Sequence, residues 1–154
     1  QTFSKNWAMT GWRIGWLECH PLLAQTAENL IQYSSSGVAT FLQRGAIAAL
    51  DHGASFVDHQ IARARAGRDI VCEGLQATGR VRFAKPEGAF YLYFKVEGAT
   101  DSMALAKRLV DDANVGLAPG SAFTKNTDPW LRLCFARKAE DLAEATARLV
   151  HALR

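Results

Sequence analysis

The sequence lacks the features that define several common protein classes. Its three cysteines are odd in number and far apart, without a CxxC pair, so a cysteine-rich zinc site is not predicted and a reduced, cytoplasmic setting is expected. No apolar run approaches the ~20 residues of a membrane span. Charge of one sign is not concentrated either, because 18 Lys and Arg are mixed with 15 Asp and Glu. The net charge of +3 therefore gives no basic patch for nucleic acid.

Common catalytic and nucleotide-binding signatures are also missing. Neither GxGxxG nor GxxxxGKS occurs, and the "SSSG" of residues 34–37 lacks the GxSxG pattern of a nucleophile elbow. His52 and His59, each preceded by an aspartate, could face a metal from one helix. No third ligand accompanies them, and solvated positions on a helix are the simpler interpretation. We therefore predict no metal site.

What the sequence does contain is enough apolar material for a sizeable core, with 154 residues of which 49% are hydrophobic and 21% charged. From about residue 53 the hydrophobic pattern predicts the order α-β-β-α-β-β-α. The helices are expected at 54–76, 101–113 and from 138, and the strands at 80–83, 89–96, 115–120 and 130–136. Such an order predicts a small sheet with helices packed against it.

The first fifty residues follow a different pattern. "WRIGWLEC" at 12–19 predicts a buried strand, and helices are predicted at 21–33 and 38–50. A strand without sheet partners cannot satisfy its backbone polar groups. We therefore interpret residues 1–52 as the remnant of a larger domain and residues 53–154 as a small C-terminal domain.

Lys5 lies in "TFSKNWAMTGWRIGW", among hydroxyls, glycines and tryptophans. A lysine with apolar and small neighbours loses its proton more readily than a solvated one. A neutral amine is what an imine with an aldehyde requires. A solvated surface lysine beside an aromatic cluster is the alternative interpretation.

Arg13 follows eight residues later, in a run whose pattern predicts burial. A buried guanidinium needs an anionic partner, yet Glu18 is the only carboxylate within the first 27 residues. A ligand phosphate suits the two-pronged guanidinium, and the hydroxyls of Thr2 and Ser4 would add donors. A carboxylate from elsewhere in the fold is the alternative partner.

This segment resembles the cofactor-lysine segment of class I/II aminotransferases, fold-type I enzymes that use pyridoxal 5′-phosphate (PLP). The lysine, "MTGW", the arginine and the following glycine all fall in register. The resemblance implies that Lys5 forms a Schiff base with PLP and that Arg13 grips the phosphate. It places Thr2 where serine is commoner, as a phosphate hydroxyl, and gives Ser4 a lesser phosphate contact.

The resemblance continues through "KPEGAFYLYF", "VGLAPGSAF" and "WLRLCFA". It implies that Arg132, in the last of these strands, binds the α-carboxylate of the substrate. Strand alternation independently places Arg132 opposite Leu131, Leu133 and Phe135, half-buried on the other face, where a planar guanidinium suits a carboxylate. An arginine on a solvated sheet face is the alternative.

The resemblance implies an α/β fold of type I, of which this chain supplies the end of the large domain and the α+β small domain. It implies transfer of an amino group between an α-amino acid and a 2-oxo acid, by an enzyme that is a homodimer as the complete protein. Other enzymes of fold type I, such as a β-lyase or a decarboxylase, share these segments and stay open as alternatives.

Two departures from the family pattern affect this interpretation. Thr124 stands where glycine is usual, which bears on the loop before Arg132. The chain also begins four residues before Lys5, whereas the reactive lysine of the family lies past the middle of longer chains. We therefore expect the isolated chain to lack activity, because residues that bind the cofactor ring would be missing. An inert C-terminal domain is the remaining alternative.

Overall fold

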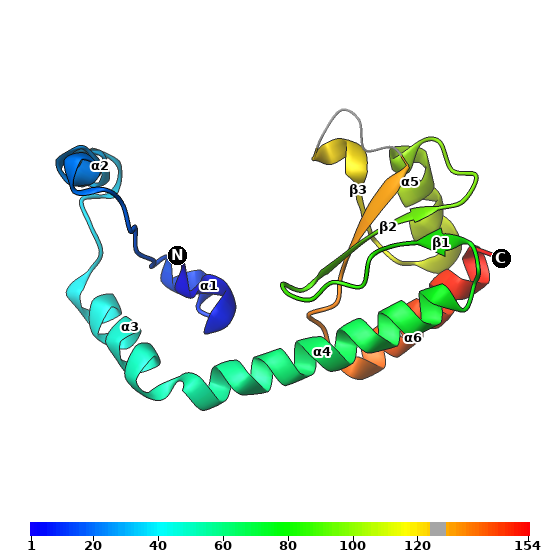
Figure 1. The fold of residues 1–154 in the computed structure, drawn as a ribbon, viewed down its shortest axis with the longest axis horizontal. Helices are drawn as coiled ribbons and strands as arrows, with labels where there is room; N and C mark the ends of the chain where they lie inside the picture. The colour runs from blue at the N-terminus through cyan, green and yellow to red at the C-terminus, as the bar shows by residue number, and fades with distance from the viewer. Residues whose placement is uncertain (124–128) are drawn as a thin grey trace. The chain divides into compact units, whose positions relative to one another are not determined.

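A computed structural model describes residues 1–123 and 129–154 of the chain. Two compact units are present, Gln1–Ile61 and Ala62–Arg154, and each is described by itself (Figure 1). The elements are α1 (Phe3–Asn6), the 3₁₀ turn η1 (Thr10–Trp12), α2 (Pro21–Ser35), α3 (Thr40–His52), α4 (Ala54–Gln76), β1 (Val81–Arg82), β2 (Tyr91–Val96), α5 (Ser102–Ala113), β3 (Ala118–Pro119), the 3₁₀ turn η2 (Gly120–Ala122), β4 (Trp130–Cys134) and α6 (Ala139–Ala152). From α4 onward the order α-β-β-α-β-β-α is the predicted one.

The helices of the first unit begin and end at recognisable signals. Pro21 opens α2, where its missing N–H is not needed, and the His20 side chain accepts from the N–H of Leu22. The helix ends where Ser36 adopts the left-handed conformation, with φ 58° and ψ 11°. Helix α3 ends at Gly53, whose N–H donates to the carbonyl of Ala49.

The predicted buried strand over residues 12–19 is wrong. The 3₁₀ turn η1 is followed by Arg13 in the left-handed region, and the only pairing in this stretch is an isolated bridge between Thr2 and Gly15. A left-handed residue interrupts an extended run, and one bridge leaves no ladder for the residues beyond it. Within the described residues 16–20 the chain is therefore irregular and exposed.

The second unit is built on an antiparallel sheet with strand order β1-β2-β4-β3. Strands β2 and β4 pair with Tyr93 opposite Arg132, and β3 pairs with β4 through Ala118 opposite the same arginine. Buried and half-buried residues alternate along both central strands. One face of the sheet is therefore apolar, and the other carries Tyr91, Tyr93, Lys95 and Arg132, the last of these as predicted.

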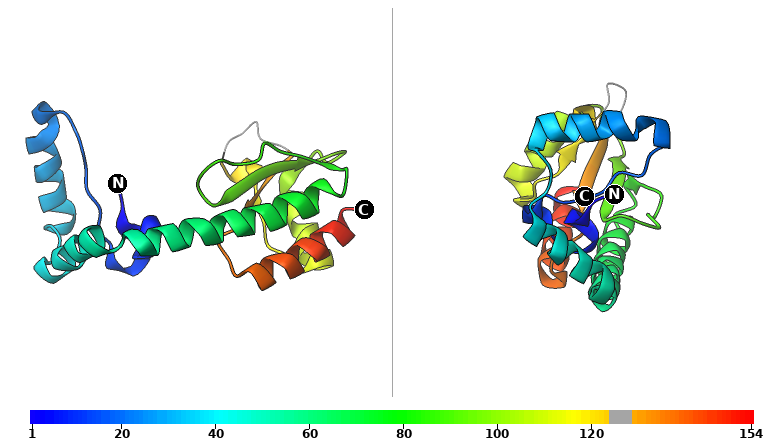
Figure 2. Two further views of the ribbon diagram at one scale, coloured as in Figure 1. Left: turned by 60° about the horizontal axis from the view of Figure 1, so that its bottom comes forward. Right: turned by 90° about the vertical axis from the view of Figure 1, so that its left-hand side faces the viewer.

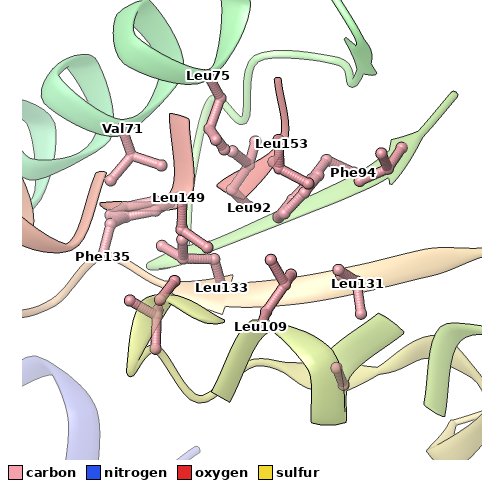
Figure 3. Packing of buried hydrophobic residues seen from close by; sticks show 14 of the residues in the cluster. Val71, Leu75, Leu92, Phe94, Leu109, Leu131, Leu133, Phe135, Leu149 and Leu153 are labelled. Carbon is pink, nitrogen blue, oxygen red and sulfur yellow. The ribbon is translucent and has the colours of Figure 1, made fainter. Parts of the chain in front are cut away.

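The apolar face of the sheet packs against helices α4, α5 and α6 (Figure 3). The fully buried side chains at the centre of this core come from the three helices and the two central strands. They include Val71 and Leu75 of α4, Leu92 and Phe94 of β2, Leu109 of α5, Leu131 of β4, and Leu149 of α6. Burial of each such side chain contributes roughly 1.5–3 kcal/mol, so this core fixes the sheet that carries Arg132.

Two glycines of α4 allow α6 and the end of β4 to approach closely (Figure 2). A Cβ at Gly67 would lie 2.5 Å from the carbonyl oxygen of Phe135 and 2.7 Å from a methyl of Leu142. A Cβ at Gly74 would overlap the methyl group of Thr146. The closeness of the contact therefore depends on the absence of side chains at both positions.

Candidate active site

In the first unit, the two ends of the motif at residues 2–16 fold against each other. The N–H of Phe3 donates to the carbonyl of Ile14 at 3.2 Å, and Gln1 and Trp16 exchange backbone hydrogen bonds of 2.7 and 3.0 Å. Gly15 makes this approach possible, because a Cβ there would overlap the carbonyl oxygen of Gln1. The segment before Lys5 is thus held beside the segment that carries Arg13.

The hydroxyls of Thr2 and Ser4 lie together immediately before the lysine. Thr2 Oγ1 accepts from the N–H of Ser4 at 3.2 Å, capping α1, and donates to Ser4 Oγ at 3.0 Å. Lys5 is the next residue of this short helix and is exposed. Two neutral oxygens therefore stand within three residues of the candidate nucleophile.

Arg13 is exposed, whereas its surroundings in the sequence predicted burial. Its backbone has φ 52° and ψ 42°, and its Nη1 donates to the carbonyl of Thr10 at 2.9 Å. Left-handed geometry costs a residue with a side chain roughly 1–2 kcal/mol, and strain of this kind gathers at binding sites. Among the described residues Arg13 forms no ion pair with a carboxylate, so its charge is available to an anion.

Aromatic rings of the motif pack against one another and against α3. Phe3 is buried, with its ring centroid 4.8 Å from Trp7 and 5.3 Å from Trp16. The ring of Trp12 lies against Gly45 of α3. The tryptophans that made the segment look like a buried strand therefore anchor a turn, and the polar side chains stay at its surface.

Arg132 belongs to the second unit, at the centre of the polar face of the sheet. It is half-buried, as alternation with Leu131 and Leu133 predicted. Its Cζ lies 4.3 Å from the centroid of the Tyr91 ring and 4.2 Å from that of Phe123. Among the described residues, no carboxylate pairs with it. The guanidinium therefore lies over two rings, and no carboxylate in that part of the chain neutralises its charge.

These ring contacts were not predicted from the sequence. Alternation places Tyr91 on the face of Arg132, but the contact with Phe123 depends on how β3 pairs with β4. Thr124, the residue that departs from the family pattern, lies outside the described residues.

The described part of the chain contains neither a metal-binding cluster nor a membrane-spanning helix. No group of three or more His, Cys, Asp or Glu could hold a metal ion there. No helix of residues 1–123 or 129–154 has the length and apolar character needed to cross a bilayer.

Comparison with known proteins identifies the family. The model of aminotransferase classes I and II matches residues 1–149, nearly the whole chain. This chain belongs to the class I and II aminotransferase family. Relatives include an aspartate aminotransferase of Thermotoga maritima, 37% identical over 96% of this chain, and a valine–pyruvate aminotransferase of Mycobacterium tuberculosis, 34% identical over 96% of it.

Solved aminotransferases share the fold. A crystal structure of an aminotransferase from M. tuberculosis superposes with a TM-score of 0.91 at 33% identity over 99% of this chain, and that of the T. maritima aspartate aminotransferase with 0.86 at 36% over 97%. The predicted fold class is therefore confirmed. The chain spans 37–40% of the length of these relatives and structures.

Proposed function

We propose that the complete protein is a PLP-dependent aminotransferase that moves an amino group between an α-amino acid and a 2-oxo acid. The observation that carries this proposal is the folded motif of the first unit, in which the hydroxyls before Lys5 are held beside the segment of Arg13. Family membership supports the same reaction, since the relatives named above are aminotransferases.

The residues of the motif fit PLP by their chemistry. One exposed guanidinium and two adjacent hydroxyls form a donor set suited to a phosphate, and Arg13 has no competing carboxylate among the described residues. Lys5 would hold the aldehyde carbon, and Arg13, Thr2 and Ser4 would hold the phosphate. When bound, the cofactor supplies an electron sink for the substrate α-carbon.

The protein's own residues supply orientation and proton transfer. Arg132 would bind the α-carboxylate through its in-plane N–H groups, which fixes the direction of the α-carbon. The Lys5 amine, when it is free and neutral, would act as the general base for the substrate α-proton. Arg13 would keep the cofactor stationary throughout.

The proposed domain assignment, localisation, oligomeric state and substrate class rest on family membership. We assign residues 1–52 to the end of the large cofactor domain and residues 53–154 to the small domain. The complete protein is proposed to be a cytoplasmic homodimer, and an aspartate-like or small aliphatic amino acid is a first substrate to test, following the names of the relatives.

The test uses the complete protein with PLP and a panel of amino acids and 2-oxo acids. We expect a new amino acid as product, whereas a β-lyase would release ammonia and pyruvate. Lys5→Ala should reduce turnover by at least about 10³-fold, because both the covalent attachment and the base are lost. Product formation by Lys5→Ala at the wild-type rate would contradict the proposal. A matched control is Lys107→Ala, which removes an exposed lysine from α5.

A further inference from the structure

The contacts of Arg132 with two aromatic rings have a consequence for the proposed carboxylate site. Its Cζ lies at nearly equal distances from the centroids of Tyr91 and Phe123, 4.3 and 4.2 Å. Tyr91 comes from β2, and Phe123 comes from the end of the 3₁₀ turn η2 that follows β3. Two separate segments therefore bring a ring to one guanidinium.

A guanidinium whose carbon lies over a ring face is attracted to that ring by its charge and not through a hydrogen bond. The N–H groups of the guanidinium that do not face a ring can therefore still donate to a carboxylate. A long arginine side chain otherwise samples many rotamers and loses that freedom on binding. Rings that already restrict it lower this entropic penalty, as preorganisation does in general.

We propose that Tyr91 and Phe123 are positioning residues that orient the Arg132 guanidinium for the α-carboxylate of the substrate. The proposal rests on the carboxylate-binding role of Arg132 given above. The two rings act through the arginine and have no role in proton transfer. The Tyr91 hydroxyl has no part in the proposed positioning of Arg132, because the contact is made by the ring.

Tyr93 provides a matched comparison on the same sheet face. It lies opposite Arg132 in the register of β2 and β4, but its ring stacks on Trp130, with centroids 5.0 Å apart and planes 7° from parallel. Removal of the Tyr93 ring therefore disturbs the same strand without removing a ring that contacts Arg132 in the described part of the chain.

The experiment compares an α-amino acid with the corresponding amine that lacks the carboxylate, using the complete protein loaded with PLP. Tyr91→Leu and Phe123→Leu should each raise KM for the amino acid about 10-fold, the effect of losing a partly desolvated cation–π contact. Both should leave kcat for the amino acid and kcat/KM for the amine near the wild-type values. Tyr91→Phe should behave like wild type, and Tyr93→Leu should leave KM for the amino acid within about 2-fold.

The outcomes separate this proposal from the role of Arg132 itself. If Arg132→Gln leaves the preference for the amino acid over the amine unchanged, the carboxylate assignment fails and the positioning role fails with it. If Arg132→Gln removes that preference while Tyr91→Leu and Phe123→Leu do not alter KM, only the positioning role is overturned. An equal loss with amino acid and amine would also overturn it. Phe123 is 47% exposed, so Phe123→Leu tests the proposal even if Tyr91→Leu impairs folding.

Discussion

Both units of the chain contain amphipathic helices, but the apolar faces of these helices are buried to very different extents. In the second unit, Leu105 and Leu109 of α5 and Leu142 and Leu149 of α6 are buried in a shared core. In the first unit, α2 has no buried residue, and its apolar side chains are largely exposed, with Leu22 at 84% and Tyr33 at 90%. Helical periodicity therefore predicts a helix in both places, but it does not predict whether a partner covers the apolar stripe.

The buried cluster of the first unit is correspondingly small. It contains Phe3, Met9, Ile14 and Ala46, all of which support the Lys5 motif or the helix beneath it. Large contiguous apolar patches are typical of interfaces in general. The second unit therefore has an extensive core of its own, whereas the buried cluster of the first unit is confined to the Lys5 motif and part of α3.

Separating the two units should give the largest difference. We expect a polypeptide of residues 54–154, which keeps α4 whole, to unfold cooperatively on heating. A polypeptide of residues 1–61 should show no cooperative transition, because its buried cluster is too small to offset chain entropy. Circular dichroism with thermal scans measures both. A sharp transition of residues 1–61, at a midpoint near that of residues 54–154, would remove the contrast.

Within the second unit, two adjacent residues of α5 sharpen the comparison. Leu109 is fully buried, and Val110 is 48% exposed. Leu109→Ala should destabilise residues 54–154 by about 2–5 kcal/mol through lost transfer energy and a cavity, while Val110→Ala should change stability by less than about 0.5 kcal/mol. Urea unfolding gives both values. Equal effects of the two substitutions would mean that the side of α5 that carries Leu109 does not pack against the core.

The contact between α4 and the end of β4 should have a smaller effect. Gly67→Ala places a methyl against the Phe135 carbonyl, which should lower the free energy of unfolding by about 1–3 kcal/mol. This loss should appear although alanine favours a helix over glycine by about 1 kcal/mol. Gly88→Ala is the control, since a Cβ there meets nothing within 4 Å. A stabilised Gly67→Ala protein would disprove the close approach.

The smallest effect concerns a surface ion pair of the second unit. The Lys85 ammonium, 2.8 Å away, and then the Arg68 guanidinium, 3.0 Å away, lower the pKa of Asp69 below its ordinary value of 3.8. Because the folded state favours the carboxylate, its contribution is fully present above pH 3.8 and is lost as the pH falls through the lowered folded-state pKa. Asp69→Asn should therefore reduce the melting temperature slightly at pH 7, and by less as the pH falls below 3.8. A difference that persists unchanged at low pH would exclude the ion pair as its cause.

Much of the second unit could be predicted from the sequence, because its signals are local. The helix over 54–76 has the predicted bounds, and the alternation of β2 gives the correct inward face. Apolar periodicity, with Gly79 after α4 and Gly98 after β2, determines these features with little help from distant residues.

The first unit and the details of each site could be predicted less well, because they depend on distant contacts. "WRIGWLEC" has the composition of a strand, yet pairing with Thr2 stops at Gly15 and Arg13 takes a left-handed conformation. The contact of Phe123 with Arg132 likewise requires the register of β3 on β4. The roles of Lys5, Arg13 and Arg132 stay predictions until they are measured.

The central claim is that Lys5 is the residue to which the cofactor aldehyde attaches, and chemical trapping tests it most directly. The complete protein is loaded with PLP, reduced with borohydride, digested and examined by peptide mass spectrometry. The account predicts a pyridoxyl-phosphate adduct on the peptide that contains Lys5, and none on that segment in Lys5→Ala. A stoichiometric adduct on another lysine, with the Lys5 peptide unmodified, would contradict it.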